Sequence, residues 1–555
     1  MLKSSGAMGA ATLSSRLLGV VRESLYAAFM GDGPVAGAFT IAFLIPNLFR
    51  RLLGEGALTA AFVPLFKEKE RTEGEESMWK AANEVLSGLT IAAVVIIALV
   101  LLGISAALYL DRPDAVTVAA RQLELQGAGV LSPTGAIGAG YLTAPTELML
   151  RLLRIMFPYM LFICATAMFM GMLNSRGHFF VPAMGSTVLN VVMIACVLWV
   201  APQWGATLDQ QIFALAFAVL FAGVAQMLYQ LPQLYREGFR LRWSPPWQSE
   251  SVRAVVQRML PGMMGVAAFQ INVLLTQGIA WTFDDSKTIN ASFGYAVRLM
   301  ELPQGLFGIS LATYLLPTLA GIAADKDFPK FRRTLKQGLG HVYFANLLAT
   351  GFLIVLSVPI IRFLFERKEF TEASTERASF ALACLAPGLI AFSTVNILAR
   401  AFYALGDMKT PMRISMFCLA LNIFLTLWLI EPFKQGGLGI ANSISAFMNA
   451  GLLFYALRRK LKYLEIGSLK TPFIQMAISA AIAAVIAYAG YRLWAETIGH
   501  ANILARAGEV FTPMILATAL YFTILTLLKN PQADEYIGLI ASKLGRKNAP
   551  PETAP

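Results

Sequence analysis

The stretch IAAVVIIALVLL, Ile91–Leu102, is a continuous apolar run with no alternation between apolar and polar positions. A run of about 20 such residues crosses the hydrocarbon core of a bilayer as a helix, because its backbone groups must find their partners within the segment. With its flanks, residues 83–109, this stretch predicts a membrane-spanning helix. Working outward in both directions, we find fourteen segments of this kind along the 555-residue chain.

The composition favours the same interpretation, since 57% of the residues are hydrophobic and 14% are charged. A soluble domain carries about 25% charged residues. We therefore expect an all-α polytopic membrane protein with 14 transmembrane helices, which two basic loops divide into six, six and two. The expected parts are an N-lobe (1–233), a cytoplasmic linker (234–253), a C-lobe (254–457), a C-terminal helix pair (471–528) and a cytoplasmic tail (529–555).

The two sets of six spans look like parallel repeats. A Pro, Gly, Pro pattern occurs in both with the same spacings of 19 and 5 residues. Its members are Pro158, Gly177 and Pro182 in the first set and Pro387, Gly406 and Pro411 in the second. In each copy we expect a helix to end near the glycine and the next to open at the proline. Transporters built from parallel repeats bind substrate between the two halves.

The net charge of +12 reflects topology more than a nucleic-acid partner. If the N-terminus lies inside and the loops alternate, inside loops hold 27 of the 45 Lys and Arg residues, outside loops hold ten, and spans hold eight. Positive residues collect on the cytoplasmic side of membrane proteins. We therefore expect both termini in the cytoplasm, basic loops attracted to anionic head groups, and no nucleic-acid partner.

Charged residues inside the predicted spans are the most informative part of the sequence. A charge at mid-bilayer costs on the order of 2.5–3.5 kcal/mol, so it tends to face a wet cavity or a partner. The first span holds Arg16, Arg22 and Glu23, the second holds Arg50, Arg51 and Glu55, and the eighth holds Arg298 and Glu301. Guanidinium groups suit phosphate, because their fork donates two parallel hydrogen bonds.

From the residues alone we expect Arg16, Arg22 and Arg298 to converge on a cationic cavity between the halves. The acidic neighbours Glu23 and Glu301 would support this cavity. For Arg50 and Arg51 a cavity role and simple ion pairing remain equally open, with Glu55 able to pair with Arg51 at i,i+4. Arg151, Arg154 and Arg400 lie near span ends, where we expect their side chains to reach the interface.

Motifs for covalent chemistry do not stand out. The chain has no phosphate-binding P-loop and no HExxH zinc motif. Three separated histidines (His178, His341, His500) and four cysteines inside predicted spans (Cys164, Cys196, Cys384, Cys418) show no metal-ligand spacing. We therefore expect a transporter and not an enzyme, with no catalytic residue, no bound metal and no cofactor.

Four stretches resemble the MurJ/MviN family of lipid II flippases, within the multidrug/oligosaccharidyl-lipid/polysaccharide exporter (MOP) superfamily. They are SSRLLGVVRESLYAAFMGDG (Ser14–Gly33), AFLIPNLFRRLLGEGALTAAFVP (Ala42–Pro64), GYAVRLMELPQGLFGISLATYLLP (Gly294–Pro317) and ARAFYALGDMKTPMR (Ala399–Arg413). The resemblance covers the first twelve spans in order, and the final pair matches the family's fourteen-helix plan. It implies a V-shaped pair of six-helix lobes around a central cavity.

The resemblance also implies a function in cell-wall biogenesis. The substrate would be lipid II, an undecaprenyl diphosphate bearing a disaccharide-pentapeptide, flipped by alternating access to the periplasmic leaflet of a bacterial inner membrane. By motif, Arg16, Arg22 and Arg298 match the residues that meet the diphosphate, Glu23 their acidic neighbour, and Arg50, Arg51 and Glu55 a polar cluster near a gate. The last two spans match a groove for the lipid tail. We expect a functional monomer, with association with the cell-wall synthesis machinery left open.

Two departures from the family make the cavity more cationic. Gly37 and Val297 stand where many members carry an aspartate. The second lobe offers Asn396 and Asp407 but no buried acidic pair, so coupling to sodium and coupling to the membrane potential both remain open. Two alternative functions also remain: a flippase for another polyprenyl-diphosphate-linked glycan, and a multidrug exporter of the same superfamily.

Overall fold

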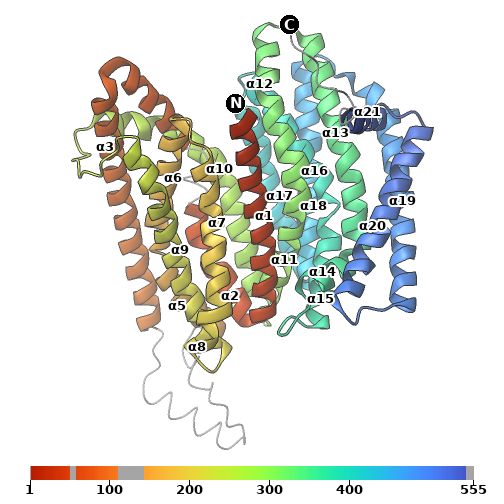
Figure 1. The fold of residues 1–555 in the computed structure, drawn as a ribbon, viewed down its shortest axis with the longest axis horizontal. Helices are drawn as coiled ribbons and strands as arrows, with labels where there is room; N and C mark the ends of the chain where they lie inside the picture. The colour runs from red at the N-terminus through yellow and green to blue at the C-terminus, as the bar shows by residue number, and fades with distance from the viewer. Residues whose placement is uncertain (1, 50–57, 111–142, 285, 546–555) are drawn as a thin grey trace, which may run out of the picture. The chain divides into compact units, whose positions relative to one another are not determined.

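The computed structural model describes residues 2–49, 58–110, 143–284 and 286–545 (Figure 1). Within these ranges all regular elements are helical and no strand occurs, which confirms the all-α prediction. Nine of the described helices are long and apolar enough to cross a membrane, or eleven if each of two bent pairs counts as one span. The predicted total of 14 stays a prediction.

Two compact units make up the chain: Met1–Ala291 with Arg367–Phe370, and Ser292–Glu366 with Thr371–Pro555. These units do not test the predicted boundary between the two repeats at residues 234–253, which stays a prediction. The described helices of the first unit are α1 (Leu2–Met30), α2 (Pro34–Phe49), α3 (Leu58–Leu110), α5 (Ala144–Met156), α6 (Tyr159–Ser175), α7 (Phe180–Ala195), η3 (Cys196–Val200), α8 (Ala201–Trp204), α9 (Leu208–Arg236) and α10 (Glu250–Phe283).

An aromatic cluster fills one end of the first unit. Phe62, Phe66 and Trp79 of α3 meet Phe169 of α6 and Phe239, with neighbouring ring centres 5.2–6.0 Å apart. Phe62, Phe66 and Phe239 are at most 1% exposed. This packing holds α3 against α6 and fixes where the chain leaves α9.

The second unit begins within α11 (Ile289–Pro303), whose first residues belong to the first unit. Its further helices are η4 (Gln304–Ile309), α12 (Ser310–Ala324), α13 (Phe328–Val355), α14 (Ser357–Phe365), α15 (Glu372–Leu385), α16 (Gly388–Ala404), α17 (Lys409–Phe433), α18 (Gln435–Lys460), η5 (Glu465–Leu469), α19 (Lys470–Thr497), α20 (Ile503–Leu527) and α21 (Pro531–Gly545).

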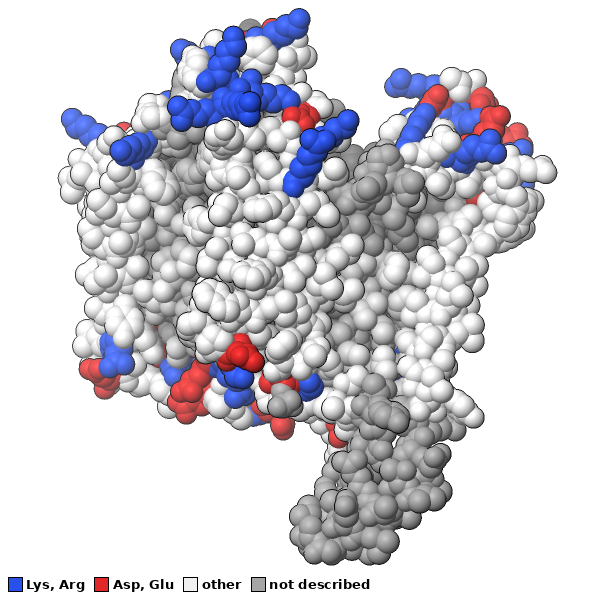
Figure 2. Space-filling model, turned by 180° about the vertical axis from the view of Figure 1, so that it is seen from behind, with Lys and Arg blue, Asp and Glu red and all other residues white. Residues whose placement is uncertain are grey.

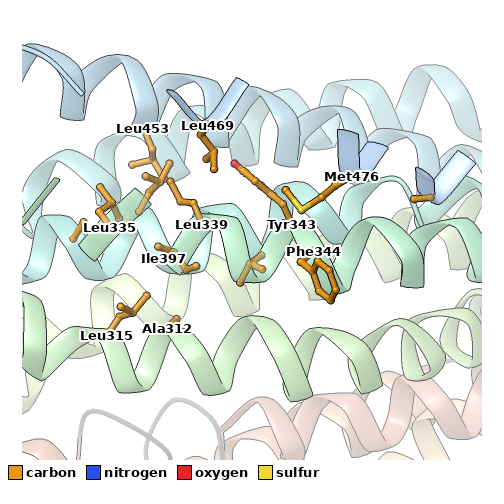
Figure 3. Close-up of a cluster of buried hydrophobic side chains, with 14 of the residues drawn as sticks. Ala312, Leu315, Leu335, Leu339, Tyr343, Phe344, Ile397, Leu453, Leu469 and Met476 are labelled. Carbon is orange, nitrogen blue, oxygen red and sulfur yellow. The ribbon is translucent and has the colours of Figure 1, made fainter. Parts of the chain in front are cut away.

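The helix α13 runs through the apolar core of the second unit. Its residues Leu339 and Tyr343 lie between side chains of α12, α16, α18 and α19 (Figure 3). Gly338 allows the close approach of α12, because a Cβ at this position would lie 2.4 Å from Leu315 Cδ1. Small residues at helix contacts are how helices pack in lipid, where burial from water supplies little driving force.

The Pro, Gly, Pro pattern builds the same local structure in each unit. α5 and α6 are bent by 44° and α15 and α16 by 46°, with Pro158 and Pro387 at the breaks. Gly177 and Gly406 then end the helices with φ of +87° and +73°. In both turns the following N–H donates back five residues at 2.9 Å, as in a Schellman cap. This confirms the predicted helix-ending turns.

On the face that Figure 2 shows, charged side chains gather near the helix ends, and the surface between these ends is mostly uncharged. That intervening surface carries exposed large apolar residues such as Leu99 on α3 and Ile515 on α20, at 65% and 67% exposed. Apolar side chains that face outward along a whole helix are typical of contact with lipid.

Candidate functional site

Arg22 lies well inside α1 and is held by polar contacts in the first unit. Its Nη1 donates to Asn190 Oδ1 of α7 at 3.0 Å, and its Nη2 donates to Glu23 Oε1 at 2.5 Å. The guanidinium carbon lies 5.4 Å from the centre of the Tyr26 ring. Since only 13% of the Arg22 side chain and 15% of Glu23 are exposed, the neighbouring carboxylate offsets a largely desolvated cation.

Asn190 contacts the candidate residue Arg22 and was not singled out from the sequence. Besides accepting from Arg22, it donates from Nδ2 to the Ser15 carbonyl at 3.0 Å, so it contacts α1 at two levels. Gly19 lies between those levels, and its Cβ would be 3.9 Å from Asn190 Nδ2. The amide thus fixes α7 to α1 and orients Arg22. The available signal was an amide within the apolar run 180–201.

Arg16 lies on α1 about 9 Å along the axis from Arg22. Its side chain is exposed, and the described side chains offer it no acceptor. Leu17 and Val21 beside it are 60% and 47% exposed. This side of α1 is therefore not packed within the first unit, and Arg16 presents its donors outward.

Arg298 and Glu301 lie in the second unit on α11. Arg298 Nη1 donates to Glu301 Oε2 at 3.0 Å, with 39% and 42% of the side chains exposed. Pro303 ends this helix, and the π-helical turn η4 follows it. Because proline removes a backbone donor, the helix here departs from α geometry one turn after the charged pair. The predicted convergence of Arg298 with Arg16 and Arg22 stays a prediction.

Gly37 is explained by packing in the first unit. A Cβ there would lie 2.6 Å from the Lys287 carbonyl oxygen and 3.1 Å from the Trp281 ring. Lys287 is only 7% exposed, and its Nζ donates to the Trp281 carbonyl and lies 5.2 Å from the ring centre. An aspartate at position 37 would therefore displace the backbone at Lys287. Val297, the other departure, is half-buried beside Arg298.

Other arginines singled out from the sequence have local roles or lie outside the described residues. Arg151 is 49% exposed and pairs with Glu147 at i,i+4. Arg400 lies 5.8 Å from the centre of the Tyr403 ring. The predicted gate residues Arg50, Arg51 and Glu55 fall outside the described residues.

Arg367, a second residue that the sequence analysis did not single out, is part of the first unit and contacts α1. Its Nη1 donates to Ser24 Oγ at 2.8 Å, next to Glu23. The N–H of Glu369 donates to the Ala28 carbonyl at 3.4 Å. The segment Arg367–Phe370 therefore covers the end of α1, and Gly31 is needed because a Cβ would lie 2.6 Å from the Glu369 carbonyl oxygen.

An ionic network lies at the end of the first unit that contains the turn after α6. Arg176 donates to Glu237 at 3.1 Å, to Glu75 at 2.9 Å and to Glu70 at 2.5 Å. His178 Nε2 lies 2.8 Å from Glu237 Oε1. The hydrogen bonds with His178 and Arg176 hold the pKa of the Glu237 carboxyl below its usual range. These contacts join the turn after α6 to α3 and α9.

Metal ligands do not cluster in the described ranges, which contain no group of three or more His, Cys, Asp or Glu able to hold an ion. The prediction that no cofactor is bound is not tested by this observation. Each unit offers guanidinium donors on a helix, α1 in the first and α11 in the second. Arg22 is oriented and partly offset, whereas Arg16 and Arg298 are accessible.

Comparisons with known proteins agree over most of the chain. A family model described as lipid II flippase MurJ matches residues 26–506. A protein of Vibrio cholerae named "Probable lipid II flippase MurJ" is 35% identical over 458 residues, covering 82% of this chain and 83% of that protein. One of the same name from Rhizobium tropici is 32% identical over 546 residues, covering 98% and 96%.

Solved structures give the same fold. The structure titled "Lipid II flippase MurJ, inward closed conformation" matches with a TM-score of 0.70 at 21% identity, covering 94% of this chain and 99% of that one. An inward-facing multidrug transporter of the MATE family, in the MOP superfamily, matches with a TM-score of 0.62 at 15% identity, covering 81% and 94%. At these identities the likeness concerns the fold alone.

Proposed function

The chain belongs to the lipid II flippase MurJ family, and we propose that Arg16, Arg22 and Arg298 hold the diphosphate of its substrate. As a lipid II flippase it moves the peptidoglycan precursor to the outer leaflet of the bacterial inner membrane, and it is a transporter. Glu23 and Glu301 offset these cations in the empty state, and Arg50, Arg51 and Glu55 act near a gate.

The topology we propose has fourteen spans, two six-helix lobes and a C-terminal pair, with both termini in the cytoplasm. Adding α1, α2 and α10 to the eleven candidate spans gives this number. The shared turns at Gly177 and Gly406 support a repeat. The pair α19 and α20 would contact the isoprenoid tail, which its exposed Val485 and Ile515 support. We propose that the monomer is the functional unit.

The three arginines would act differently on the diphosphate. Arg22 donates through Nη1 to Asn190 and through Nη2 to Glu23. It would therefore act on the diphosphate as a positive charge held in a fixed position. Arg16, exposed inside the span, has donors available for phosphate oxygens. Arg298 and Glu301 form a pair that is about 40% exposed, and such pairs contribute about 0–1 kcal/mol. Arg298 can therefore give up its bond to Glu301 at little cost.

Alternating access supplies the transport step. The cavity takes the head group from the cytoplasmic leaflet while the tail stays in lipid, and rearrangement of the lobes exposes the head group outside. An inside-negative potential favours outward movement of an anion by about 2.3 kcal/mol per charge per 100 mV. Engagement of Asp407 by Lys460 at 2.7 Å and Thr410 at 2.9 Å, outside the spans, supports the potential over sodium as the energy source.

The test is complementation of a bacterium depleted of its own lipid II flippase. Arg16→Ala and Arg298→Ala should each fail to restore growth at normal protein levels, with lipid II accumulating in membrane extracts. Losing a hydrogen bond to a charged group costs about 2 kcal/mol, roughly a 25-fold loss in affinity for the head group. Arg151→Ala is the matched control, because Arg151 is an exposed arginine in a surface pair.

Growth with Arg298→Ala at the rate of the Arg151→Ala control would remove Arg298 from the site. Rescue by Arg298→Lys equal to wild type would show that charge alone suffices, against a role for the guanidinium fork. If depletion raised a different polyprenyl-diphosphate glycan while lipid II stayed normal, the proposed substrate would be wrong.

A further inference from the structure

The connection from α9 to α10 lies alongside α3 (Figure 1). Residues 239–247 of this connection, with the sequence FRLRWSPPW, are called the strap here. Phe239 anchors its start in the aromatic cluster. Asn83 of α3 then donates to the Arg240 carbonyl at 3.0 Å and accepts from the Arg242 N–H at 2.9 Å. These bonds give an irregular segment a defined path.

The strap runs toward the apolar part of the α3 span. After Asn83, the next contact is Ser87 Oγ, which accepts from the Ser244 N–H at 3.3 Å. Pro246 then packs at Gly88, where a Cβ would lie 3.3 Å from the proline Cβ. Five residues of α3 correspond to about 7–8 Å along the helix axis. The end of the strap therefore lies one turn from the continuous apolar run Ile91–Leu102.

The outward side chains of the strap are aromatic, apolar and basic. Trp243, Trp247 and Leu241 are 63%, 70% and 57% exposed. Arg240 and Arg242 are exposed as well, and Nη1 of Arg240 also donates to the Tyr235 and Phe239 carbonyls at 2.8 Å. No acidic residue occurs between Gly238 and Gln248 in the sequence, and the nearby Glu84 of α3 accepts from Ser249 Oγ just beyond the strap at 2.5 Å.

This order of side chains matches the interface of a bilayer. Tryptophan favours the head-group level, where its ring meets apolar chains and its N–H meets water. Arginine binds phosphate with two parallel hydrogen bonds and is drawn to anionic lipid. On α3, the deeper residues Val95 and Leu99 are 50% and 65% exposed, so the same side of the unit continues as an apolar surface.

We propose that the strap binds anionic phospholipid head groups of the cytoplasmic leaflet. Arg240 and Arg242 contact the lipid phosphates, and the rings of Trp243 and Trp247 lie in the interface beside α3. The leaflet assignment rests on the cytoplasmic placement of this loop in the proposed topology. The binding itself is independent of the transport site, because the strap residues are distinct from the proposed diphosphate ligands.

The experiment places the full chain in nanodiscs whose acyl chains are brominated near the head group. One set contains brominated phosphatidylglycerol in a phosphatidylcholine background, and the other contains brominated phosphatidylcholine at the same fraction. Bromine quenches tryptophan emission on contact, and the chain has eight tryptophans. Subtracting the emission of Trp243→Phe/Trp247→Phe from that of the wild type isolates the strap.

The isolated signal should be quenched at least twofold more by the anionic lipid than by the zwitterionic one. Arg240→Gln/Arg242→Gln should abolish this preference while the chain keeps a cooperative melting transition in detergent, and Arg242→Gln alone, which leaves the Arg240 contacts with Tyr235 and Phe239 in place, should weaken it. The matched control is Trp199→Phe/Trp204→Phe. These tryptophans are 66% and 49% exposed, and no Lys or Arg occurs between residues 177 and 235. Their isolated signal should show no preference.

Absence of quenching by either lipid would overturn the proposal and leave the strap as a surface for water or a protein partner. Equal quenching by both lipids would overturn the selection for anionic head groups. Growth complementation by Arg240→Gln/Arg242→Gln serves as a separate readout. Since it tests transport, its result distinguishes failure of the lipid site from failure of the proposed function.

Discussion

Replacing Glu509 by leucine should strongly destabilise the second unit. Glu509 of α20 is fully buried, and its Oε1 accepts from Arg362 Nη1 of α14 at 3.0 Å. The Arg362 side chain is only 9% exposed. An arginine cannot lose its proton in a protein, so the leucine variant keeps a buried cation without its main partner.

The magnitude follows from the remaining contacts. Breaking a buried ion pair by removing one partner costs about 3–5 kcal/mol. Arg362 Nε keeps Glu366 Oε2 at 3.6 Å, but Glu366 also accepts from Arg506 at 3.3 Å and from Thr375 at 2.8 Å. Because Arg362 keeps this carboxylate as a partial partner, the cost should be at least the lower end of the range, about 3 kcal/mol. For a unit of this size, that corresponds to a fall of about 6 °C or more in melting temperature.

The assay is thermal unfolding of the purified chain in one detergent, for wild type, Glu509→Leu, Arg362→Met and the double variant. The double variant should melt within about 3 °C of wild type, because two apolar side chains of similar volume can replace a buried pair at little cost. A coupling energy of about 3 kcal/mol is expected between the two sites. If Glu509→Leu melted within 1 °C of wild type, the buried pair would have no structural role and the reasoning would fail.

Three further predictions concern other contacts. Asn190→Ala should lower stability by about 1–3 kcal/mol and reduce lipid II transport, because Arg22 and the Ser15 carbonyl both lose a partner. Gly37→Ala should destabilise by about 1–3 kcal/mol in a melting experiment, because its Cβ meets the Lys287 carbonyl oxygen at 2.6 Å. Asp407→Asn should remove a pH-dependent contribution to the free energy of unfolding. Partial burial acts to raise the pKa of Asp407, but hydrogen bonds with Lys460 and Thr410 hold this pKa at about 2. As pH falls, the Asp407 carboxyl takes up a proton in the unfolded chain before it does so in the folded chain. The stabilisation by Asp407 is therefore complete above about pH 4 and is lost as pH falls through 2. The difference in melting temperature between wild type and Asp407→Asn should vanish there.

Two variants serve as controls for this group. Gly103→Ala lies on an exposed part of α3, where a Cβ would meet nothing within 4 Å, so it should leave the melting temperature unchanged or raise it. Thr187→Val lies one turn from Asn190 on α7 and has only a long contact of 3.8 Å to the Met184 sulfur. Loss of transport with Thr187→Val equal to that with Asn190→Ala would mean that any change in α7 is harmful.

Helix class and the repeated turns could be predicted because they depend on local composition. Continuous apolar runs predict spans, and the Pro, Gly, Pro spacing predicts where helices end, as Gly177 and Gly406 confirm with their positive φ. The bends at Pro158 and Pro387 were not predicted from the sequence, since a proline can either open a helix or bend one.

Partners across the fold could not be predicted in the same way. Asn190 meets Arg22 across 168 residues, and Arg362 meets Glu509 across 147. Arg362 lies buried in α14, and its pairing with α20 could not be read from the surrounding sequence. Gly37 is a similar case. The sequence showed it only as a position where many family members carry an aspartate, whereas the fold shows that a side chain there would collide with the Lys287 carbonyl.

Arginine alone does not mark a transport site, since this chain places arginine within its helices in two opposite settings, buried and accessible. Arg362 is 9% exposed and pairs with a carboxylate that has no exposed surface, so releasing it for a ligand would cost about 3 kcal/mol or more. A flippase must bind a diphosphate and then let it go, and so it needs cations whose present partners are weak. Arg16 is exposed within its span, and Arg298 holds Glu301 in a pair open to solvent. If Arg16 and Arg298 hold the diphosphate as proposed, then accessibility, and not charge, separates the arginines that exchange partners from those that stabilise the fold.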